Sequence, residues 1–230
     1  MPVFSLDDEL VFPHPTLRDP DGLLAVGGSL SPERILLAYR WGIFPWFHSD
    51  QPILWWWLTP RLMVRPSEIH ISHSVRNAIN QKKFRVTIDK DFENVIHRCS
   101  AVPRPGQSGG TWILPEMIEA YTGLFRTGYA HSVEVMSDGK LVGGLYGIAL
   151  GKIFFGESMF SEKPNASKTG FIFLAKHLES LGFEWIDCQQ DTPHMRTLGG
   201  QLIAEDDFLN LLRENQRYLL NAKENGIKFI

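Results

Sequence analysis

Cysteine is scarce in this 230-residue sequence, and long apolar runs and an excess of positive charge are absent. Cys99 and Cys188 are the only two cysteines, which excludes a disulfide framework. No stretch approaches the roughly eighteen apolar residues that indicate a membrane-spanning helix. The first residues, with acids at positions 7 to 9, show no basic-then-apolar signal pattern. We therefore expect a cytoplasmic protein that makes no contact with a membrane.

Lys and Arg number 23 against 26 Asp and Glu, a formal charge of −3, so contact with nucleic acid would require a local basic patch. No glycine-rich loop ending in Lys-Ser or Lys-Thr is present to bind a nucleotide phosphate. The glycines between positions 143 and 147 lie in an expected strand, where they more often mark a bulge or a close backbone approach. His70 and His73 lack the third ligand of a zinc site. We expect no cofactor and no metal.

Aromatic residues are the feature that stands out, with 7 Trp, 5 Tyr and 15 Phe. They are concentrated, together with turn-forming residues, in the first sixty positions. Near Thr59-Pro60-Arg61 the composition changes to alternating expected strands and helices. A chain of this length forms one or two domains. We therefore predict a small aromatic-rich N-terminal domain over 1–60 and a second domain over 61–230.

Local signals predict an α+β fold. Ser31 and Pro32 begin a helix with an apolar stripe, which Gly42 ends. A meander follows later: a strand over 132–136, a turn over 137–140, a return strand over 141–150 and a third strand from 153. A long helix with an apolar face over 171–181 and a short strand over 185–189 complete the pattern. Such a mixed sheet covered by helices has the element order of the acyl-CoA N-acetyltransferase (GNAT) fold, an analogy of fold only.

Three polar residues are candidates for chemistry. Asp187 and Gln189 lie two apart on the expected strand, so their side chains would share one face. Burying a carboxylate and an amide in the core would be costly, whereas in a cleft they would form a proton-handling pair. Glu157 adds a second acid just after a neighbouring strand. The alternative, three polar residues on the surface, is equally compatible with the pattern.

Cys188 could act as a nucleophile with His131 or His194 as its base. We favour the other interpretation, because a thiol within an apolar strand is usually a small buried hydrophobic group.

Two features favour binding to nucleic acid. Trp46 and Trp112 lie in expected loops, and exposed aromatics in such loops stack on bases. The segment from Arg61 to Arg104 holds nine basic and four acidic residues, an excess of +5 in a chain of −3. This excess is either a solvated face or a docking site for nucleic acid.

The sequence resembles the leucyl/phenylalanyl-tRNA–protein transferase family, bacterial aminoacyltransferases of the N-degron pathway. The resemblance runs from residue 22 to about residue 200 and rests on the stretches GLLAVGG at 22–28, GIFPWF at 42–47, PILWW at 52–56, GESMFS at 156–161, NASKT at 165–169 and IDCQ at 186–189.

The resemblance implies an enzyme that moves Leu or Phe from tRNA to the N-terminal amine of proteins beginning with Arg or Lys, marking them for degradation. Because an apolar pocket discriminates only weakly between similar side chains, we expect Met as a minor donor. It implies direct attack on the aminoacyl ester without a covalent enzyme intermediate, and a GNAT-like catalytic domain over 61–230. Its partners would be Leu-tRNA, Phe-tRNA and the acceptor protein. The site residues it implies are Asp187, Gln189 and Glu157 for catalysis, Trp46 and Trp112 for stacking on the aminoacyl-adenosine, and Leu145, Phe154, Met159, Phe171, Leu174 and Ile186 for the side-chain pocket.

One departure from the family concerns a basic helix that contacts tRNA, where this chain has the weaker residues His73, Asn77, Asn80 and Gln81. We expect Arg76, Lys82 and Lys83 to contact the tRNA backbone instead.

Two rival functions remain. One is a non-catalytic RNA-binding module. The other is an acetyltransferase using acetyl-CoA, which is disfavoured because residues 161–167 replace its glycine-rich pyrophosphate turn.

Overall fold

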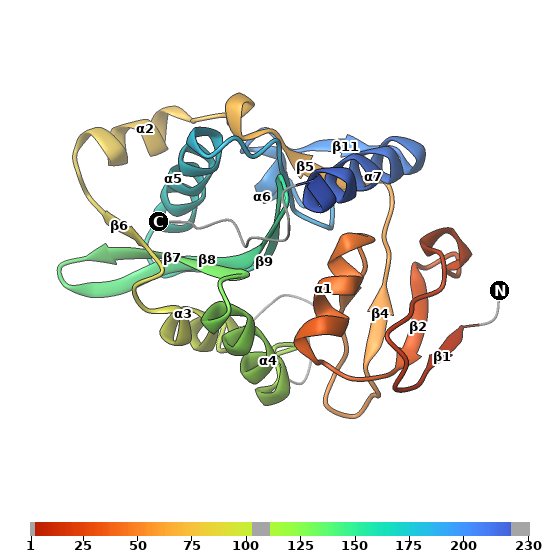
Figure 1. Ribbon diagram of the computed structural model, residues 1–230. Helices are drawn as coiled ribbons and strands as arrows, with labels where there is room; N and C mark the ends of the chain where they lie inside the picture. The colour runs from red at the N-terminus through yellow and green to blue at the C-terminus, as the bar shows by residue number, and fades with distance from the viewer. Residues whose placement is uncertain (1–2, 103–110, 222–230) are drawn as a thin grey trace.

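The structure, a computed structural model, describes residues 3–102 and 111–221, and the chain forms two sheets (Figure 1). The first sheet has the strand order β1-β2-β4-β3 and is built from the N-terminal part of the chain. Its strands are β1 (Phe4–Leu6), β2 (Leu23–Gly27), β3 (Phe44–Pro45) and β4 (Leu54–Trp56). Short 3-10 turns lie at Pro15–Leu17 and Pro66–Glu68.

Helix α1 (Pro32–Arg40) connects β2 to β3 and confirms the predicted capped helix. The side chain of Ser31 accepts a hydrogen bond from the backbone N–H of Arg34 at 3.3 Å, and Pro32 occupies the first helical position. Gly42 follows the helix with φ +69°, a conformation that glycine adopts without strain.

The second sheet has seven strands in the order β11-β5-β10-β9-β8-β7-β6. It is mixed, because β9 and β10 are parallel and the other neighbours are antiparallel. The strands are β5 (Arg61–Val64), β6 (Arg85–Ile88), β7 (Ala130–Ser137), β8 (Lys140–Leu150), β9 (Ile153–Ser161), β10 (Trp185–Asp187) and β11 (Gln201–Ile203).

Helices cover both faces of this sheet, α2 and α5 on one side and α3 and α4 on the other (Figure 1). Phe171 of α5 packs with Leu145 and Phe154 on the first side. Phe92 of α3 packs with Tyr146 on the second. The helices are α2 (His73–Asn80), α3 (Phe92–Ser100), α4 (Pro115–Arg126), α5 (Ala166–Ser180), α6 (Pro193–Arg196) and α7 (Glu205–Asn221).

The α+β class, the mixed sheet covered by helices and the meander of β7, β8 and β9 are confirmed. Asp138 and Gly139 form the tight turn between β7 and β8 with positive φ angles, as the hairpin geometry requires. In the described parts of the chain, no helix combines the length and the apolar character needed to span a membrane.

The two sheets share a hydrophobic core. Trp55 and Trp57 are fully buried, and the Trp57 ring lies 5.8 Å from the ring of Phe208 on α7. Tyr39 of α1 packs edge-on against Phe155 of β9 at 5.2 Å. The first sheet ends at Trp56 and the second begins at Arg61. The domain division at residue 60 stays a prediction, and the shared core joins both parts.

Candidate active site

A β-bulge at Glu157 forms the centre of the site. Tyr146 of β8 pairs with Ser158 and Gly147 pairs with Gly156, so Glu157 is one extra residue in β9. The bulge changes which face of the sheet the side chains occupy. Phe155 packs with Tyr39 of α1 in one core, whereas Met159 packs against the other core, to which α5 contributes. A bulge redirects the side chain at which it occurs. It therefore explains how a carboxyl in the middle of an apolar strand reaches polar partners.

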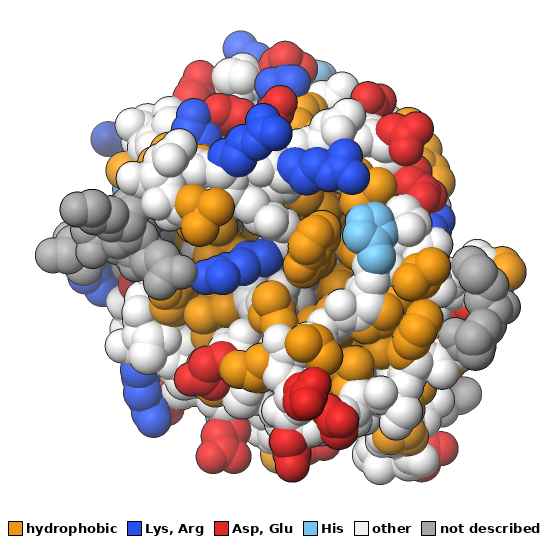
Figure 2. Space-filling model, turned by 45° about the vertical axis from the view of Figure 1, so that its right-hand side comes forward, with side chains coloured by type: hydrophobic (Ala, Val, Ile, Leu, Met, Phe, Trp, Pro, Cys, Tyr) orange, Lys and Arg blue, Asp and Glu red, His pale blue; other side chains and the backbone are white. Residues whose placement is uncertain are grey.

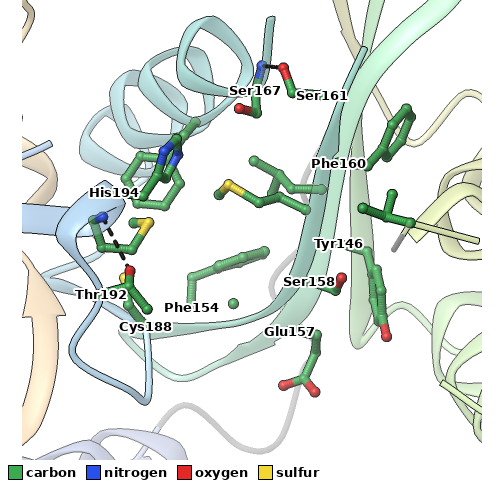
Figure 3. A pocket seen from close by; sticks show the side chains of 16 residues that line it. Tyr146, Phe154, Glu157, Ser158, Phe160, Ser161, Ser167, Cys188, Thr192 and His194 are labelled. Carbon is green, nitrogen blue, oxygen red and sulfur yellow. Dashed lines mark hydrogen bonds between the residues drawn. The ribbon is translucent and has the colours of Figure 1, made fainter. Parts of the chain in front are cut away.

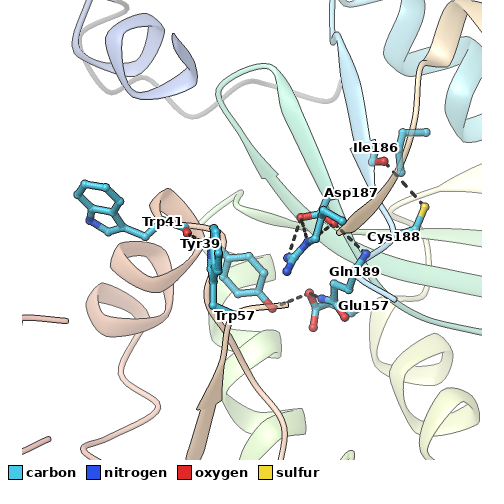
Figure 4. A network of polar contacts seen from close by, with 9 residues as sticks. Tyr39, Trp41, Trp57, Glu157, Ile186, Asp187, Cys188 and Gln189 are labelled. Carbon is cyan, nitrogen blue, oxygen red and sulfur yellow. Dashed lines mark hydrogen bonds and ion pairs between the residues drawn. The ribbon is translucent and has the colours of Figure 1, made fainter. Parts of the chain in front are cut away.

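The Glu157 residue is 9% exposed, and its carboxyl accepts hydrogen bonds from three groups, of which Tyr39 and Gln189 are drawn in Figure 4. The phenol of Tyr39 donates to Oε1 at 2.5 Å, that of Tyr121 to Oε2 at 3.0 Å, and Nε2 of Gln189 to Oε1 at 3.3 Å. Burial raises the pKa of Glu157 to about 7, although the two phenols and Arg61 favour the charged form. Glu157 is therefore a carboxyl that can exchange a proton near neutral pH.

Asp187 forms an ion pair with Arg61, and both side chains are fully buried. Nε of Arg61 donates to Oδ1 at 2.8 Å and Nη2 donates to Oδ2 at 2.8 Å. The backbone N–H of Gln189 also donates to Oδ1 at 2.8 Å. Asp187 therefore holds the chain at the point where Gln189 turns toward Glu157.

The predicted alternation of Asp187 and Gln189 along one strand is wrong. Strand β10 ends at Asp187, and Gln189 has φ +60°, in the left-handed region. The hydrogen bond from the Gln189 backbone to the Asp187 carboxylate brings the two residues together, not the pleat of a strand.

A pocket of about 400 Å³ opens beside Glu157 (Figure 3). It lies where β9 continues past the end of its parallel neighbour β10, so that the two chain segments diverge. Four predicted pocket residues line it, whereas Leu174 and Ile186 are buried in the adjoining core and are not part of the lining. The predicted residues that line it are Leu145, Phe154, Met159 and Phe171, and they share the wall with Gly156, Cys188, Thr192, His194 and Met195.

Cys188 and His194 lie on the wall of this pocket without forming a nucleophile–base pair in the described hydrogen bonds. Sγ of Cys188 donates to the carbonyl of Ile186 at 3.8 Å. Burial, followed by the nearby Asp187 charge, raises the pKa of the thiol, which disfavours the reactive thiolate. Burial and the neighbouring Lys168 lower the pKa of His194. His131, the other candidate base, binds Asp89 through Nδ1 at 2.7 Å.

The two predicted stacking residues differ in exposure. Trp46 is half-buried, and its ring lies 5.7 Å from that of Trp56. Trp112 is only 7% exposed and belongs to the core, so the expectation that it is an exposed loop aromatic is wrong. The two glycines before Trp112 in the sequence do not indicate whether its side chain is packed in the core.

Basic side chains do not coat the molecule. On the face in Figure 2, hydrophobic side chains gather in the middle, most Lys and Arg lie in the upper half, and many acids lie along the lower edge. Arg76, Lys82 and Lys83 are exposed, and the two lysines line a crevice of about 490 Å³ at the β7–β8 hairpin. Arg61 does not contribute to an exposed patch, because it is buried against Asp187. Arg104 lies outside the described residues.

Sequence reasoning missed three residues of the network, namely Tyr39, Tyr121 and the Arg61 partner of Asp187. Tyr39 and Tyr121 share the buried faces of α1 and α4 with apolar residues, so their spacing is that of core residues. In the sequence, Arg61 is the first residue of the segment with an excess of basic residues. No local signal distinguishes them, because their polar atoms meet Glu157 and Asp187 only in the folded chain.

Comparison with known proteins gives consistent matches. The family model described as "Leucyl/phenylalanyl-tRNA protein transferase" matches residues 63–213, and the model of that family's N-terminal domain matches residues 28–56. A protein of Maridesulfovibrio salexigens named leucyl/phenylalanyl-tRNA–protein transferase is 51% identical over 215 residues, which cover 93% of this chain and 89% of that protein. A protein of the same name from Syntrophobacter fumaroxidans is 52% identical over 215 residues, covering 94% and 92%.

Similar solved structures include a GCN5-related N-acetyltransferase from Kribbella flavida, with a TM-score of 0.40 and 12% identity over 63% of this chain and 54% of that one. The structure of L-PGS from Bacillus licheniformis has a TM-score of 0.40 and 12% identity, covering 71% of this chain and 50% of that one.

Proposed function

Since the chain belongs to the leucyl/phenylalanyl-tRNA–protein transferase family, we propose that it moves Leu or Phe from tRNA to the N-terminal α-amine of proteins that begin with Arg or Lys. It is an aminoacyltransferase, an enzyme of the acyltransferase class. The added residue would mark the acceptor protein for degradation. Because its donor is an aminoacyl-tRNA, we place the reaction in the cytoplasm.

The observation that carries this proposal is the position of Glu157, a carboxyl with a pKa of about 7 on the wall of an apolar pocket. An aminoacyl ester is already activated, so the reaction needs a neutral amine and a route for one proton. The amine nitrogen forms a bond to the ester carbonyl carbon, and the bond from that carbon to the ribose oxygen breaks. Glu157 accepts the proton that the amine loses and passes it to the departing ribose oxygen, so the transfer is balanced and the carboxylate is regenerated.

Gln189 and Asp187 have supporting parts in this mechanism. The Gln189 amide contacts Glu157, and its carbonyl oxygen is available to orient the attacking amine. Asp187, held by Arg61, anchors the backbone of Gln189. In this proposal Asp187 acts through Gln189 as a positioning residue, because its oxygens are occupied by Arg61 and by the Gln189 N–H and the side chain is fully buried.

The apolar pocket is proposed to hold the side chain of the donor amino acid. Leu and Phe are unbranched at Cβ and fit a wall of Phe and Met side chains. Such a wall discriminates by only about 1–3 kcal/mol per methylene, which leaves Met as a minor donor. Trp46 and the small exposed part of Trp112 are proposed to line the site of the 3′ adenosine, with Arg76, Lys82 and Lys83 on the tRNA backbone.

The test is incubation of the protein with Phe-tRNA carrying labelled Phe and a peptide that begins with Arg. We expect label on the peptide N-terminus, no transfer to the same peptide with an acetylated N-terminus, and little transfer to a peptide beginning with Ala. Binding of Phe-tRNA without transfer would indicate an RNA-binding module. Acetylation of the peptide from acetyl-CoA would indicate an acetyltransferase.

A further inference from the structure

Three oxygen-bearing groups from three separate elements meet in the interior beside the pocket. The phenol oxygens of Tyr39 on α1 and Tyr121 on α4 lie 2.7 Å apart. Each also contacts a different carboxyl oxygen of Glu157 on β9, at 2.5 Å and 3.0 Å. Both tyrosines are fully buried. The three side chains therefore form a closed triangle of hydrogen-bond contacts, part of which is drawn in Figure 4.

The number of hydrogen bonds in this triangle depends on the protonation of Glu157. Each phenol carries one hydrogen and the ionised carboxylate carries none, so two hydrogens serve three oxygen–oxygen contacts. When Glu157 is protonated, the third hydrogen is present. Tyr121 can then donate to Tyr39, Tyr39 to Oε1 of Glu157, and Oε2 of Glu157 to Tyr121. Hydrogen bonds linked in this way strengthen one another in a low-dielectric interior.

Of the three groups in the triangle, Glu157 is the one that exchanges a proton near neutral pH. Burial raises the pKa of both phenols well above their ordinary value, and the Glu157 charge raises it further, so both remain protonated at neutral pH. From the end of β10, Gln189 faces Glu157 with an amide that does not titrate. Asp187 on β10 and Arg61 on β5 also act on Glu157, and they are paired with each other.

We propose that Tyr39 and Tyr121 are positioning residues of the transfer reaction, which hold Glu157 as the proton acceptor and close a ring of three hydrogen bonds when the proton arrives. The inference rests on the proposed function, in which Glu157 takes the proton of the attacking amine. Because Tyr39 lies on α1, it also assigns the N-terminal part of the chain a role in proton transfer.

The experiment compares the wild type with Tyr39→Phe and Tyr121→Phe, each of which removes one oxygen and keeps the ring that packs in the core. The matched control is Tyr129→Phe, the same change at a half-buried tyrosine after α4 that lies outside the triangle. The kcat and KM for Phe transfer to an Arg-initiated peptide are measured across pH. In parallel, the protonated carboxyl of Glu157 is titrated as the infrared band that Glu157→Gln removes.

Losing one phenol removes a hydrogen bond to the charged carboxylate and also opens the neutral ring. Hydrogen bonds to a charged group are the stronger ones, so we expect the pKa of Glu157 to rise. We expect the acid limb of kcat and the infrared midpoint to move together to higher pH by about one unit in both Tyr variants. The KM for Phe-tRNA and the behaviour of Tyr129→Phe should match the wild type.

Two results would overturn the inference: an unchanged infrared midpoint and acid limb in folded Tyr39→Phe and Tyr121→Phe, or a loss of kcat with no movement of either. Failure of the proposed function is distinguishable from both. In that case the wild type would transfer no Phe, while the infrared titration would still report whether the two tyrosines set the protonation of Glu157.

Discussion

Arg61 forms a bidentate ion pair with Asp187, and both side chains are fully buried. The two residues are 126 positions apart in the sequence. Arg61 is the first residue of β5, and Asp187 is the last residue of β10, the neighbouring strand in the seven-stranded sheet. The same carboxylate binds the backbone of Gln189, whose amide contacts Glu157. One buried ion pair thus anchors the segment that turns from the sheet into the proposed active site.

Asp187→Ala should weaken both the fold and the reaction. It leaves the Arg61 charge buried without a partner, which costs about 3–5 kcal/mol of unfolding free energy. Gln189 also loses its anchor, so we expect transfer to fall by about 10²-fold or more while Phe-tRNA binding is largely kept. Urea unfolding and transfer assays measure the two effects.

The control Glu179→Ala breaks an exposed ion pair with Lys176 and should lower the free energy of unfolding by less than about 1 kcal/mol. Near-normal turnover by a folded Asp187→Ala protein would remove Asp187 from the mechanism.

The parts of the fold that sequence could predict depend on neighbouring residues. Ser31, Pro32 and Gly42 specify the ends of α1, and Asp138-Gly139 specifies the β7–β8 turn, because caps and tight turns need particular side chains at particular positions.

The chemistry of the site depends on contacts between distant residues, and these could not be predicted from local pattern. Tyr39 has the spacing of an ordinary core residue, yet its phenol binds Glu157, 118 positions away. The bulge at Glu157 arises from the register of two strands and has no marker in either strand alone. Asp187, Gln189 and Glu157 are nevertheless predictable from the sequence, because polar residues beside apolar strands stand out and because the family resemblance includes them.

Cys188→Ala should retain transfer activity within a few fold of the wild type. Burial raises the pKa of this thiol, so the thiolate needed for nucleophilic attack is scarce at neutral pH. Transfer kinetics measure the rate, and mass spectrometry of the quenched reaction detects any adduct. A covalent aminoacyl group on Cys188 would replace direct attack with a two-step mechanism.

Met159→Trp should impair transfer of Phe more than transfer of Leu. Met159 lines the pocket and is half-buried, so a larger ring there takes space from the larger donor side chain. The measurement is kcat/KM for Phe-tRNA and Leu-tRNA with one peptide. Equal losses for both donors would mean that the substitution disturbs the fold or that Met159 does not contact the donor.

A triple Arg76→Ala/Lys82→Ala/Lys83→Ala variant should bind tRNA with a weaker dependence on salt. All three side chains are exposed, and each lost phosphate contact lowers the log–log salt slope by about 0.7–0.9. Leu-tRNA and Phe-tRNA should be affected alike, since phosphates carry no sequence information. A minimal aminoacyl-adenosine donor, which has no stem, should be nearly unaffected. If the slope for full tRNA does not change, these side chains form only a solvated face.

The most direct test of the proposed mechanism is the single-turnover rate of Phe transfer to an Arg-initiated peptide, measured across pH for the wild type and Glu157→Gln. The carboxylate is the form that accepts the proton, so the wild-type rate should fall as pH drops through about 7, the pKa of Glu157. Glu157→Gln should lower the rate by about 10²–10⁴-fold. It should also keep only the titration of the acceptor amine, whose ordinary pKa is about 7.7–8.0. A folded Glu157→Gln protein with the wild-type rate and the wild-type pH profile would contradict the assignment of Glu157 as the proton acceptor.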